Sequence, residues 1–431
     1  MLEKYVKELG DFIESCPTPF HAVRTIRTVL TNLGYTKLNE VDEWKLEPNK
    51  KYFVERDERS VIAFKIPEEA KRFLITASHN DSPSFRVKPD SYMQKGQYKV
   101  LNTEPYGGLL AYTWFDKPLG IAGRCMVKTS KGIESRLVDL AGHSFVIPSL
   151  AIHLNREANS NMSVNYQSDT LPLVGLTDTD TTLDKQLEKI CCYEDNEKIL
   201  GTDLFLYNKE KMTTCGLDNE LILCPKLDDL GCAFSTLEAF LEADIKDSVD
   251  VCAIFDNEEV GSGSNHGAAS TFLTDTLERI SQAMNYDKYR MYASSMLVSA
   301  DNAHAVHPEF MGKSDPTCNC QLNKGIVIKY SANLSYTTDG LSAAIFKDIC
   351  DSVDVKYQEY TNRSDMRGGS TLGHIALEKL SIPSVDIGLA QLAMHSSNET
   401  AGAKDIQYMV KALKKFFESS ININCGDITI K

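Results

Sequence analysis

The sequence holds 431 residues, of which 42% are hydrophobic and 25% are charged, a balance typical of a globular protein. Because a single hydrophobic core stops growing at about 250–300 residues, we expect two domains. The formal net charge of -14 argues against a general nucleic-acid binder, which needs a basic face.

The first ninety residues are predicted to form two helices followed by strands. Val6, Leu9, Phe12 and Ile13 recur at helical spacing, and residues 20–33 favour a second helix. The N-terminal segment lacks the basic start and apolar middle of a signal peptide. The chain also lacks the run of about 18 apolar residues that spans a bilayer. We therefore expect a cytoplasmic protein without a membrane partner.

The 12 cysteines are scattered and form no CxxC pair. In a large chain without a signal peptide, this pattern favours free buried thiols over disulfides.

The character of the sequence changes near residue 90. Short alternating segments separated by Gly, Asn and Asp turns predict a mostly β insertion over residues 92–219. Within it, residues 156–200 are polar and irregular and indicate a surface excursion, with a helix at residues 183–194 as the alternative.

From residue 226 onward, strands and helices alternate. Residues 227–243 predict a helix with a capping Asp at its start, and residues 403–420 predict the last helix. Alternation of this length predicts a mixed, largely parallel sheet with helices on both faces. The interpretation is one α/β domain of residues 1–91 and 220–431, interrupted by the β-rich insertion.

Residues able to bind metal follow several predicted strands. His79, Glu259 and Asp301 come at or just after apolar runs, His395 follows another after a short loop, and Asp228 opens a helix. Functional groups collect beyond the carboxyl ends of strands in α/β sheets. Because buried carboxylates without a cation are costly, their joint occurrence predicts divalent ions.

The types of ligand indicate which metal binds. Imidazole and carboxylate without thiolate suit zinc, with cobalt or manganese as substitutes. Two histidines and several carboxylates exceed what one zinc needs, so a carboxylate bridging two ions is predicted. Glu258 precedes Glu259, and in extended backbone the two side chains would point to opposite sides. One could then bind metal while the other acts as a general base.

The chain resembles the aspartyl aminopeptidase / aminopeptidase I family of zinc metallopeptidases. The resemblance runs almost end to end. It is carried by the motifs CPTPFHAV, SHNDSPSFRVKP, GGLLAYTWFDKPLGIAGR, IPSLAIHLNR, PKLDDL, FDNEEVGS, SADNAHAVHPEF, NRSDMRGGSTLG and MHSSNETAGAKD.

The resemblance implies a co-catalytic di-zinc aminopeptidase. His79 and His395 would be terminal ligands, Asp228 the bridge, and Glu259 and Asp301 the remaining ligands. A second set of residues would support the chemistry: Glu258 as base, Asp81 behind the His79 ring, His304 near the reacting carbonyl, and His153 reaching a neighbouring subunit's site.

The family fold is a zinc-peptidase domain with a β-rich dimerisation domain, assembling from dimers into a homo-oligomeric dodecamer. Lys329 resembles a lysine in the pocket for the first side chain, which would favour peptides with an acidic first residue. An equally weighted interpretation is that Lys329 only pairs with a site carboxylate. Broad or neutral specificity is the alternative function.

The sequence departs from the family pattern at two positions near these residues and in the loop before His395, which reads GLAQLAMHS where the family often has Pro and Met. Asp229 stands where the family often has Asn, and Asn257 where it often has His. Neither change removes a predicted ligand.

Three other functions fit the sequence less well. A zinc carboxypeptidase or deacylase needs a basic group for a substrate carboxylate. A nucleotide-binding module would use Gly261 and Gly263, but the sixth position is His266 and no Walker lysine follows. A catalytically inactive scaffold would have lost ligands that are all present here.

Overall fold

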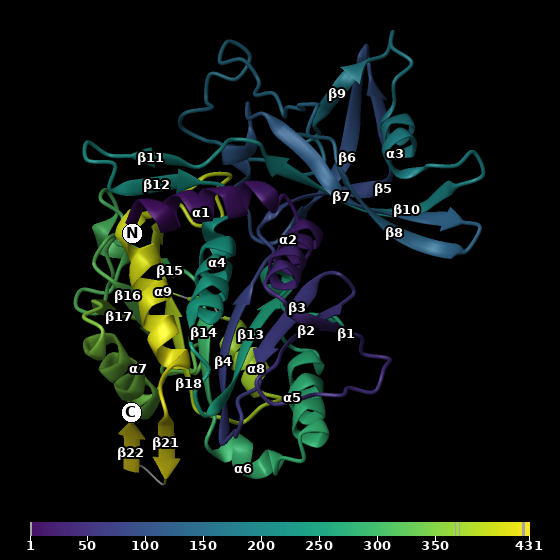
Figure 1. Ribbon diagram of the computed structural model, residues 1–431. Helices are drawn as coiled ribbons and strands as arrows, with labels where there is room; N and C mark the ends of the chain where they lie inside the picture. The colour runs from purple at the N-terminus through teal and green to yellow at the C-terminus, as the bar shows by residue number, and fades with distance from the viewer. Residues whose placement is uncertain (1, 367, 370, 425–426) are drawn as a thin grey trace.

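The computed structural model describes residues 2–366, 368–369, 371–424 and 427–431. A large α/β body contains both ends of the chain, and a second, mostly β body projects from one end of it (Figure 1).

The centre of the large body is a nine-stranded sheet in the order β1-β2-β3-β13-β4-β14-β18-β16-β17. Five neighbouring pairs are parallel, and the pairs β2–β3, β3–β13 and β16–β18 are antiparallel. The predicted mixed, largely parallel sheet is therefore confirmed. Its strands are β1 (Thr36–Leu38), β2 (Lys51–Arg56), β3 (Ser60–Lys65), β4 (Arg72–His79), β13 (Ser248–Phe255), β14 (Met296–Ala300), β16 (Ile326–Tyr330), β17 (Tyr357–Thr361) and β18 (Ser384–Gly388).

Helices cover both faces of this sheet (Figure 1). Successive strand side chains point to opposite faces, so Leu74 and Ile254 join one core while Phe73, Ile75 and Val251 join the other. The first core is completed by α1 (Leu2–Ser15), α2 (Pro19–Asn32), α4 (Leu227–Glu242), α7 (Gly340–Ser352) and α9 (Ala403–Phe417). The second is completed by α5 (Phe272–Ala283), α6 (Lys288–Ala293) and α8 (Leu372–Leu377).

The second body is built on a six-stranded sheet in the order β8-β7-β10-β5-β6-β9, with every pair antiparallel. Its elements are β5 (Ser84–Lys95), β6 (Tyr98–Tyr106), β7 (Leu119–Thr129), β8 (Gly132–Asp139), β9 (Leu173–Leu176), α3 (Leu183–Cys191) and β10 (Lys198–Asn208). This sheet has its own core, which includes Phe85, Trp114 and Leu204. The domain boundaries at residues 92 and 219 stay a prediction.

A five-stranded sheet, β11-β12-β20-β19-β15, lies beside the main one. Its strands are β11 (Thr213–Cys215), β12 (Leu221–Cys224), β15 (Ala303–His304), β19 (Ala390–Leu392) and β20 (Glu399–Gly402). Beyond α9 the chain forms a hairpin of β21 (Ile421–Asn424) and β22 (Asp427–Ile430), which the sequence patterns did not indicate. The described residues also form three short 3-10 helices: η1 (Ala111–Trp114), η2 (Glu258–Val260) and η3 (Met311–Lys313).

Most predicted helices and strands from residue 226 onward are present within a few residues of their expected ends. Among the cysteines that the structure describes, all are free thiols and most are buried, as expected. No described helix combines the length and apolar character needed to cross a membrane.

Candidate metal centre

Three neighbouring strands of the main sheet end together at one edge. The strands β13, β4 and β14 are adjacent and parallel, and Phe255 pairs with His79 at the ends of the first two. His79 is therefore the last residue of β4, while Glu259 and Asp301 follow the ends of β13 and β14. The shared strand direction brings residues from distant parts of the sequence to one place.

Asp228 lies between the two histidines. Its Oδ1 is 3.5 Å from His79 Nε2, and its Oδ2 is 3.4 Å from His395 Nε2. The predicted capping role of an Asp at this helix start is wrong. Asp228 has non-helical backbone angles (φ -87°, ψ 104°), and no side chain caps α4. Its carboxylate instead presents one oxygen to each imidazole, the arrangement of a bridging ligand.

The surrounding carboxylates complete three groups that could bind a metal ion. In each group, one ligand atom per residue lies within 4.8 Å of the others. The groups are His79 with Asp228, Asp229 and Asp301; His79 with Glu258 and Glu259; and Asp228 with Glu259 and His395. The structure thus brings together all five residues predicted as ligands.

The centre contains several buried carboxyl groups close to one another. Burial and the neighbouring carboxylates raise the pKa of Glu258 to about 8, and the same two causes raise the pKa of Glu259 well above its ordinary value. Burial alone would lower the pKa of His79, but Asp229, Asp228 and Asp81 together raise it well above its ordinary value. The site therefore attracts positive charge strongly.

Several buried oxygens of the centre lack a hydrogen-bond partner in the described part of the chain, and divalent cations would satisfy them. Within the described residues, Asp228 Oδ1, Asp229 Oδ1 and Glu259 Oε1 are buried and have no hydrogen-bond partner. Such atoms are costly unless a cation satisfies them. Two imidazoles and several carboxylates, without a thiolate, match the ligands of catalytic zinc.

The prediction that Glu258 and Glu259 point to opposite sides of an extended segment is wrong. The pair does not lie in extended backbone. It opens the 3-10 helix η2, directly after Asn257 at φ 65°. Both carboxylates turn toward His79 as a result. What distinguishes them is that Glu259 Oε2 also lies 3.5 Å from His395 Nε2.

Asp81 supports this arrangement from behind. Its Oδ1 is 3.3 Å from His79 Nδ1 and accepts from the Glu258 amide at 3.1 Å, while its Oδ2 accepts from the Glu259 amide at 3.2 Å. A carboxylate behind a ligating histidine fixes the ring orientation and its tautomer. His79 Nδ1 also lies 3.1 Å from the Asp81 backbone carbonyl, so the role that the resemblance implied for the carboxylate stays a prediction.

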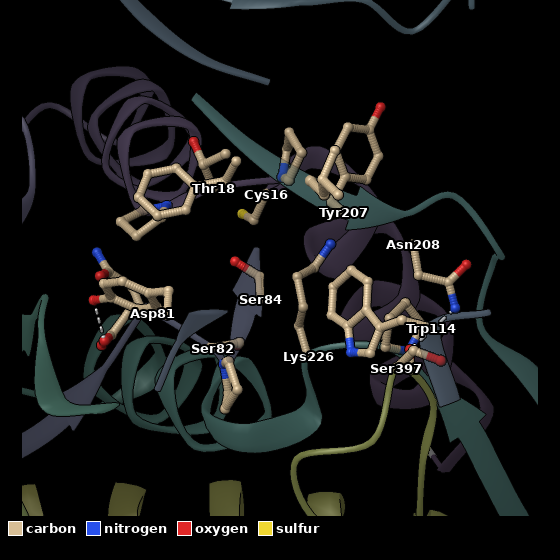
Figure 2. A pocket seen from close by; sticks show the side chains of 18 of the residues that line it. Cys16, Thr18, Asp81, Ser82, Ser84, Trp114, Tyr207, Asn208, Lys226 and Ser397 are labelled. Atoms are coloured by element: carbon tan, nitrogen blue, oxygen red, sulfur yellow. Dashed lines mark hydrogen bonds between the residues drawn. The ribbon is translucent and has the colours of Figure 1, made fainter. Parts of the chain in front are cut away.

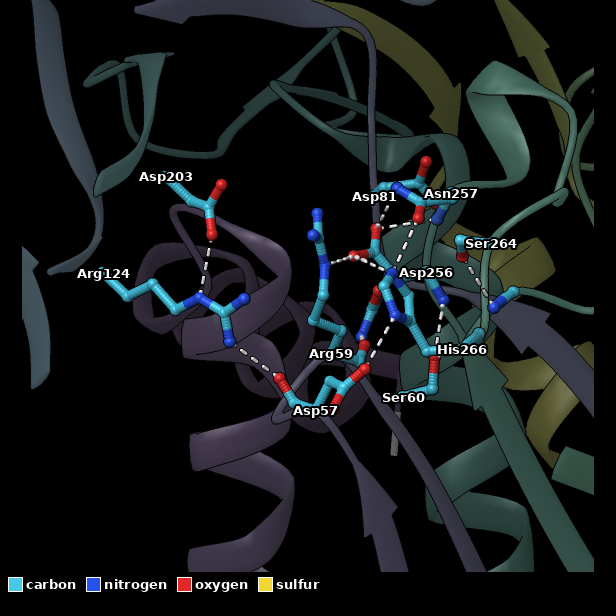
Figure 3. Close-up of polar contacts among 12 residues, drawn as sticks. Asp57, Arg59, Ser60, Asp81, Arg124, Asp203, Asp256, Asn257, Ser264 and His266 are labelled. Carbon is cyan, nitrogen blue, oxygen red and sulfur yellow. Dashed lines mark hydrogen bonds and ion pairs between the residues drawn. The ribbon is translucent and has the colours of Figure 1, made fainter. Parts of the chain in front are cut away.

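A polar network continues outward from Asp81 (Figure 3). Tyr106 donates to Asp81, and Asn257 Nδ2 donates to the Tyr106 hydroxyl at 2.8 Å. On the other side of Asn257, its Oδ1 lies 2.8 Å from His266 Nε2. The network fixes the turn that carries both glutamates. Asn257 stands where the family often has His, and His266 is its partner in this chain.

Glu399, at the start of β20, supports the other side of the centre. Its carboxylate is buried and accepts from the Asp228 amide at 2.9 Å and from the His395 amide at 2.7 Å. One side chain therefore positions the backbone of two predicted ligands.

The remaining predicted residues lie in three different places. Lys329 is buried, and its Nζ donates to the carbonyls of Asp301 at 2.7 Å and Asn302 at 3.2 Å. His304 is exposed on β15, which pairs with β19 just before His395. His153 is exposed in the connection between β8 and β9, outside all three groups.

A cavity of about 40 Å³ lies against the supporting residues (Figure 2). Its lining includes Asp81 and Glu399, which support the centre, together with Cys16, Ser82 and Lys226. At about 10–15 Å³ for each water, it has room for roughly three waters. It is too small to be the peptide pocket.

Sequence reasoning missed three residues that the structure adds to the site. Asp229 was treated as a departure from the family pattern, yet it belongs to the first group. Glu399 lies within the quoted motif MHSSNETAGAKD, but nothing in its local sequence marks it. Tyr106 comes from the second sheet, and only the fold shows its contact.

Comparison with known proteins places the chain in a family. The model of the family described as aminopeptidase I zinc metalloprotease (M18) matches residues 12–417. A probable M18 family aminopeptidase 2 from Clostridium novyi (strain NT) is 42% identical over 426 residues, covering 96% of this chain and 98% of that protein.

Solved structures share the whole fold. A chain in the cryo-EM structure of the Ape4 and Nbr1 complex aligns with a TM-score of 0.91 at 34% identity, over 97% of this chain and 86% of that one. The S. cerevisiae mApe1 dodecamer aligns with a TM-score of 0.84 at 26% identity, over 96% of this chain and 97% of that one.

Proposed function

The chain belongs to the aminopeptidase I zinc metalloprotease (M18) family, whose members hydrolyse peptides from the N-terminus, and we propose that it does so with two zinc ions at one centre. The observation that carries the proposal is Asp228, whose two carboxylate oxygens each face a different histidine at 3.5 and 3.4 Å.

The proposed ligands divide around this bridge. His79 and Asp301 would bind one ion, and His395 and Glu259 the other, with Asp228 shared; cobalt or manganese could substitute. Asp229 lies close enough to take part on the His79 side. Zinc at such a centre acidifies water and polarises the substrate carbonyl.

Glu258 is the proposed general base. It lies beside His79 and Glu259 at the centre, in position to exchange a proton with water bound there. Its carboxylate would take the proton of the attacking water and pass it to the leaving amine. His304 would donate to the carbonyl oxygen of the scissile bond as charge develops there.

The free α-amine of the substrate would bind among the surplus carboxylates. The alternative of a zinc carboxypeptidase or deacylase needs a free basic group for a substrate carboxylate. Lys329 is the buried cation beside Asp301, and its ammonium already donates to two carbonyls. This geometry favours the amine end of a peptide over the carboxyl end.

We also propose a homo-oligomer, with the dodecamer as the expected form. The support is the likeness to the mApe1 dodecamer over 96% of this chain. In such an assembly the exposed His153 would reach a neighbouring subunit's site. Mass photometry of the purified protein tests the size, and a stable monomer at working concentration would contradict it.

The function is tested with purified protein in two measurements. The first is zinc content by mass spectrometry, for which we expect two equivalents. The second is hydrolysis of a panel of aminoacyl-4-nitroanilides with and without a chelator. We expect cleavage that the chelator abolishes and zinc restores.

The Glu258→Gln variant tests whether Glu258 acts as the general base and not as a zinc ligand. We expect this variant to retain both zinc equivalents and lose at least about 100-fold in kcat, the usual contribution of a general base. Glu278→Gln, an exposed glutamate on α5, is the matched control. Turnover by Glu258→Gln close to that of the control would rule out its assignment.

A further inference from the structure

His395 has an unusual backbone conformation. Its φ is +67°, in the left-handed region that non-glycine residues rarely adopt. The residue lies in the tight connection between β19 and β20 and presents Nε2 to Asp228 and Glu259. Because the conformation is intrinsically unfavourable, the surrounding structure must maintain it.

The connection between β6 and β7, residues 107–118, supplies two of the contacts to His395. The Gly108 carbonyl oxygen lies 3.0 Å from His395 Nδ1, and the Leu110 amide donates to the His395 carbonyl at 2.9 Å. An imidazole that donates Nδ1–H to a carbonyl leaves Nε2 unprotonated and directed at the centre. The β6–β7 connection thus fixes both the backbone and the ring.

Thr113, in the same connection, binds the residue two positions after His395. Its Oγ1 accepts from the Ser397 amide at 2.9 Å, and its carbonyl accepts from the Ser397 hydroxyl at 2.6 Å. Ser397 is buried, so these bonds are shielded from water.

Gly107 brings the β6–β7 connection against a second predicted ligand. Its φ is +73°, and a Cβ there would lie 3.2 Å from Glu259 Cβ. Only glycine permits this approach without moving Glu259. The connection therefore contacts both His395 and Glu259.

The same loop also forms hydrogen bonds with residues at and just after the end of β10. Asn208 Nδ2 donates to the Ser397 carbonyl at 3.0 Å, and Asn398 donates to Glu210. Both Asn208 and the β6–β7 connection extend from the second sheet. Residues of the second body thus hydrogen-bond to the His395 loop at His395, Ser397 and Asn398.

We propose that the β6–β7 connection is a positioning element for one half of the metal centre, the half formed by His395 and Glu259. The other half, around His79, is positioned by Asp81 and the main sheet instead. The second body then has a function within its own chain, besides any in assembly. This inference rests on the proposed function only in that the centre binds zinc.

The test compares three single substitutions by zinc retention during dialysis against increasing chelator. Thr113→Val removes the hydroxyl with little change of volume, and Thr113→Ser keeps the hydroxyl. Thr129→Val is the matched control. The Thr129 hydroxyl makes the same kind of bonds, to Gly132 O and from Lys131 N, in the β7–β8 turn.

We expect Thr113→Val to bind one zinc equivalent about 10-fold more weakly, the low end of the effect of groups that orient ligands. The second equivalent should be retained as in the wild type. Thr113→Ser and Thr129→Val should both match the wild type. Wild-type retention of both equivalents by Thr113→Val would overturn the inference.

A further variant and a further measurement distinguish loss of positioning from loss of folding. Ser397→Ala removes the hydroxyl bond from the other partner and should weaken the same equivalent, which covers a failure of Thr113→Val to fold. Thr113→Val leaves the buried Ser397 amide without its acceptor, so it should unfold in chelator at a lower temperature than Thr129→Val. Positioning is recognised by the loss of one zinc equivalent alone, since a general loss of stability would weaken both. Absence of zinc from the wild type would instead refute the proposed function.

Discussion

The Tyr106 hydroxyl, at the end of β6, donates a 2.7 Å hydrogen bond to Asp81 Oδ2. Asp81 in turn accepts from the amides of Glu258 and Glu259. A residue of the second sheet therefore orients the carboxylate that supports both the proposed base and a proposed ligand. This contact and the hydrogen bonds of the β6–β7 connection to the His395 loop are separate links from the second sheet to the centre.

Tyr106→Phe should lower kcat by about 10-fold, because Asp81 loses a donor and can rotate, and changes behind a ligating histidine cost 10–100-fold. KM should change little, since Tyr106 does not touch the proposed ligands. Steady-state kinetics with the preferred aminoacyl-4-nitroanilide measure both constants.

Tyr207→Phe provides the matched control for this prediction. Tyr207 lies on β10 of the same sheet, and its hydroxyl donates to Asp139 Oδ1 at 2.8 Å. It should have kcat close to wild type. Equal effects of the two substitutions would show that Tyr106 acts on stability and not through Asp81.

Glu399→Gln should weaken zinc binding by about 10-fold or more, the range for residues that orient ligands. Glutamine replaces one acceptor oxygen with an NH2 donor, so either the Asp228 amide or the His395 amide loses its partner. Chelator titration followed by zinc analysis measures the change. Unaltered zinc affinity in a folded Glu399→Gln variant would contradict the role.

The residues at strand ends could be predicted from the sequence, whereas those supporting them could not. His79 and Asp301 follow apolar runs that fix strand position and direction, and parallel neighbours must end at the same edge. Two local predictions were wrong. Asp228 does not cap its helix, and Glu258 begins a 3-10 turn instead of an extended segment.

The supporting contacts join parts of the chain that no local pattern relates. Glu399 binds the amide of Asp228, 171 positions away, and Ser397 binds Thr113 at a separation of 284. Periodicity indicates which face of an element is buried, but it carries no information on which distant loop reaches that face. The contact of Ser397 with Thr113 depends on how the second body docks, whereas Glu399 and Asp228 both belong to the large body.

His21 predicts a pH effect on stability that is separate from the metal centre. Burial lowers its pKa from 6.5 to about 3, and its Nδ1 lies 2.8 Å from Thr18 Oγ1. Between pH 6.5 and 3 the unfolded chain binds a proton that the folded chain does not. Stability is therefore retained above pH 6.5 and lost as the pH falls, by about 2 kcal/mol at pH 5.

The measurement compares wild type with His21→Gln, both in chelator, by urea unfolding at pH 7 and pH 5. The difference between the two proteins cancels the titration of the other groups. The wild type should lose about 2 kcal/mol more than the variant on acidification, since glutamine does not titrate. Parallel losses would show that the His21 ring accepts a proton in the folded state.

Lys329 decides between two interpretations of specificity. Its ammonium donates to the carbonyls of Asp301 and Asn302 and lies 3.7 Å from Asp301 Oδ2, so it supports a proposed ligand and has little capacity left for a substrate. Lys329→Ala should therefore lower kcat by about 10–100-fold alike for the Asp-, Glu- and Leu-4-nitroanilides, the range expected of a group that orients a ligand. A loss confined to the Asp and Glu substrates would instead place Lys329 in the pocket for an acidic first residue. Because the three substrates differ only in the first side chain, their ratio separates the two interpretations even if the variant binds zinc less tightly.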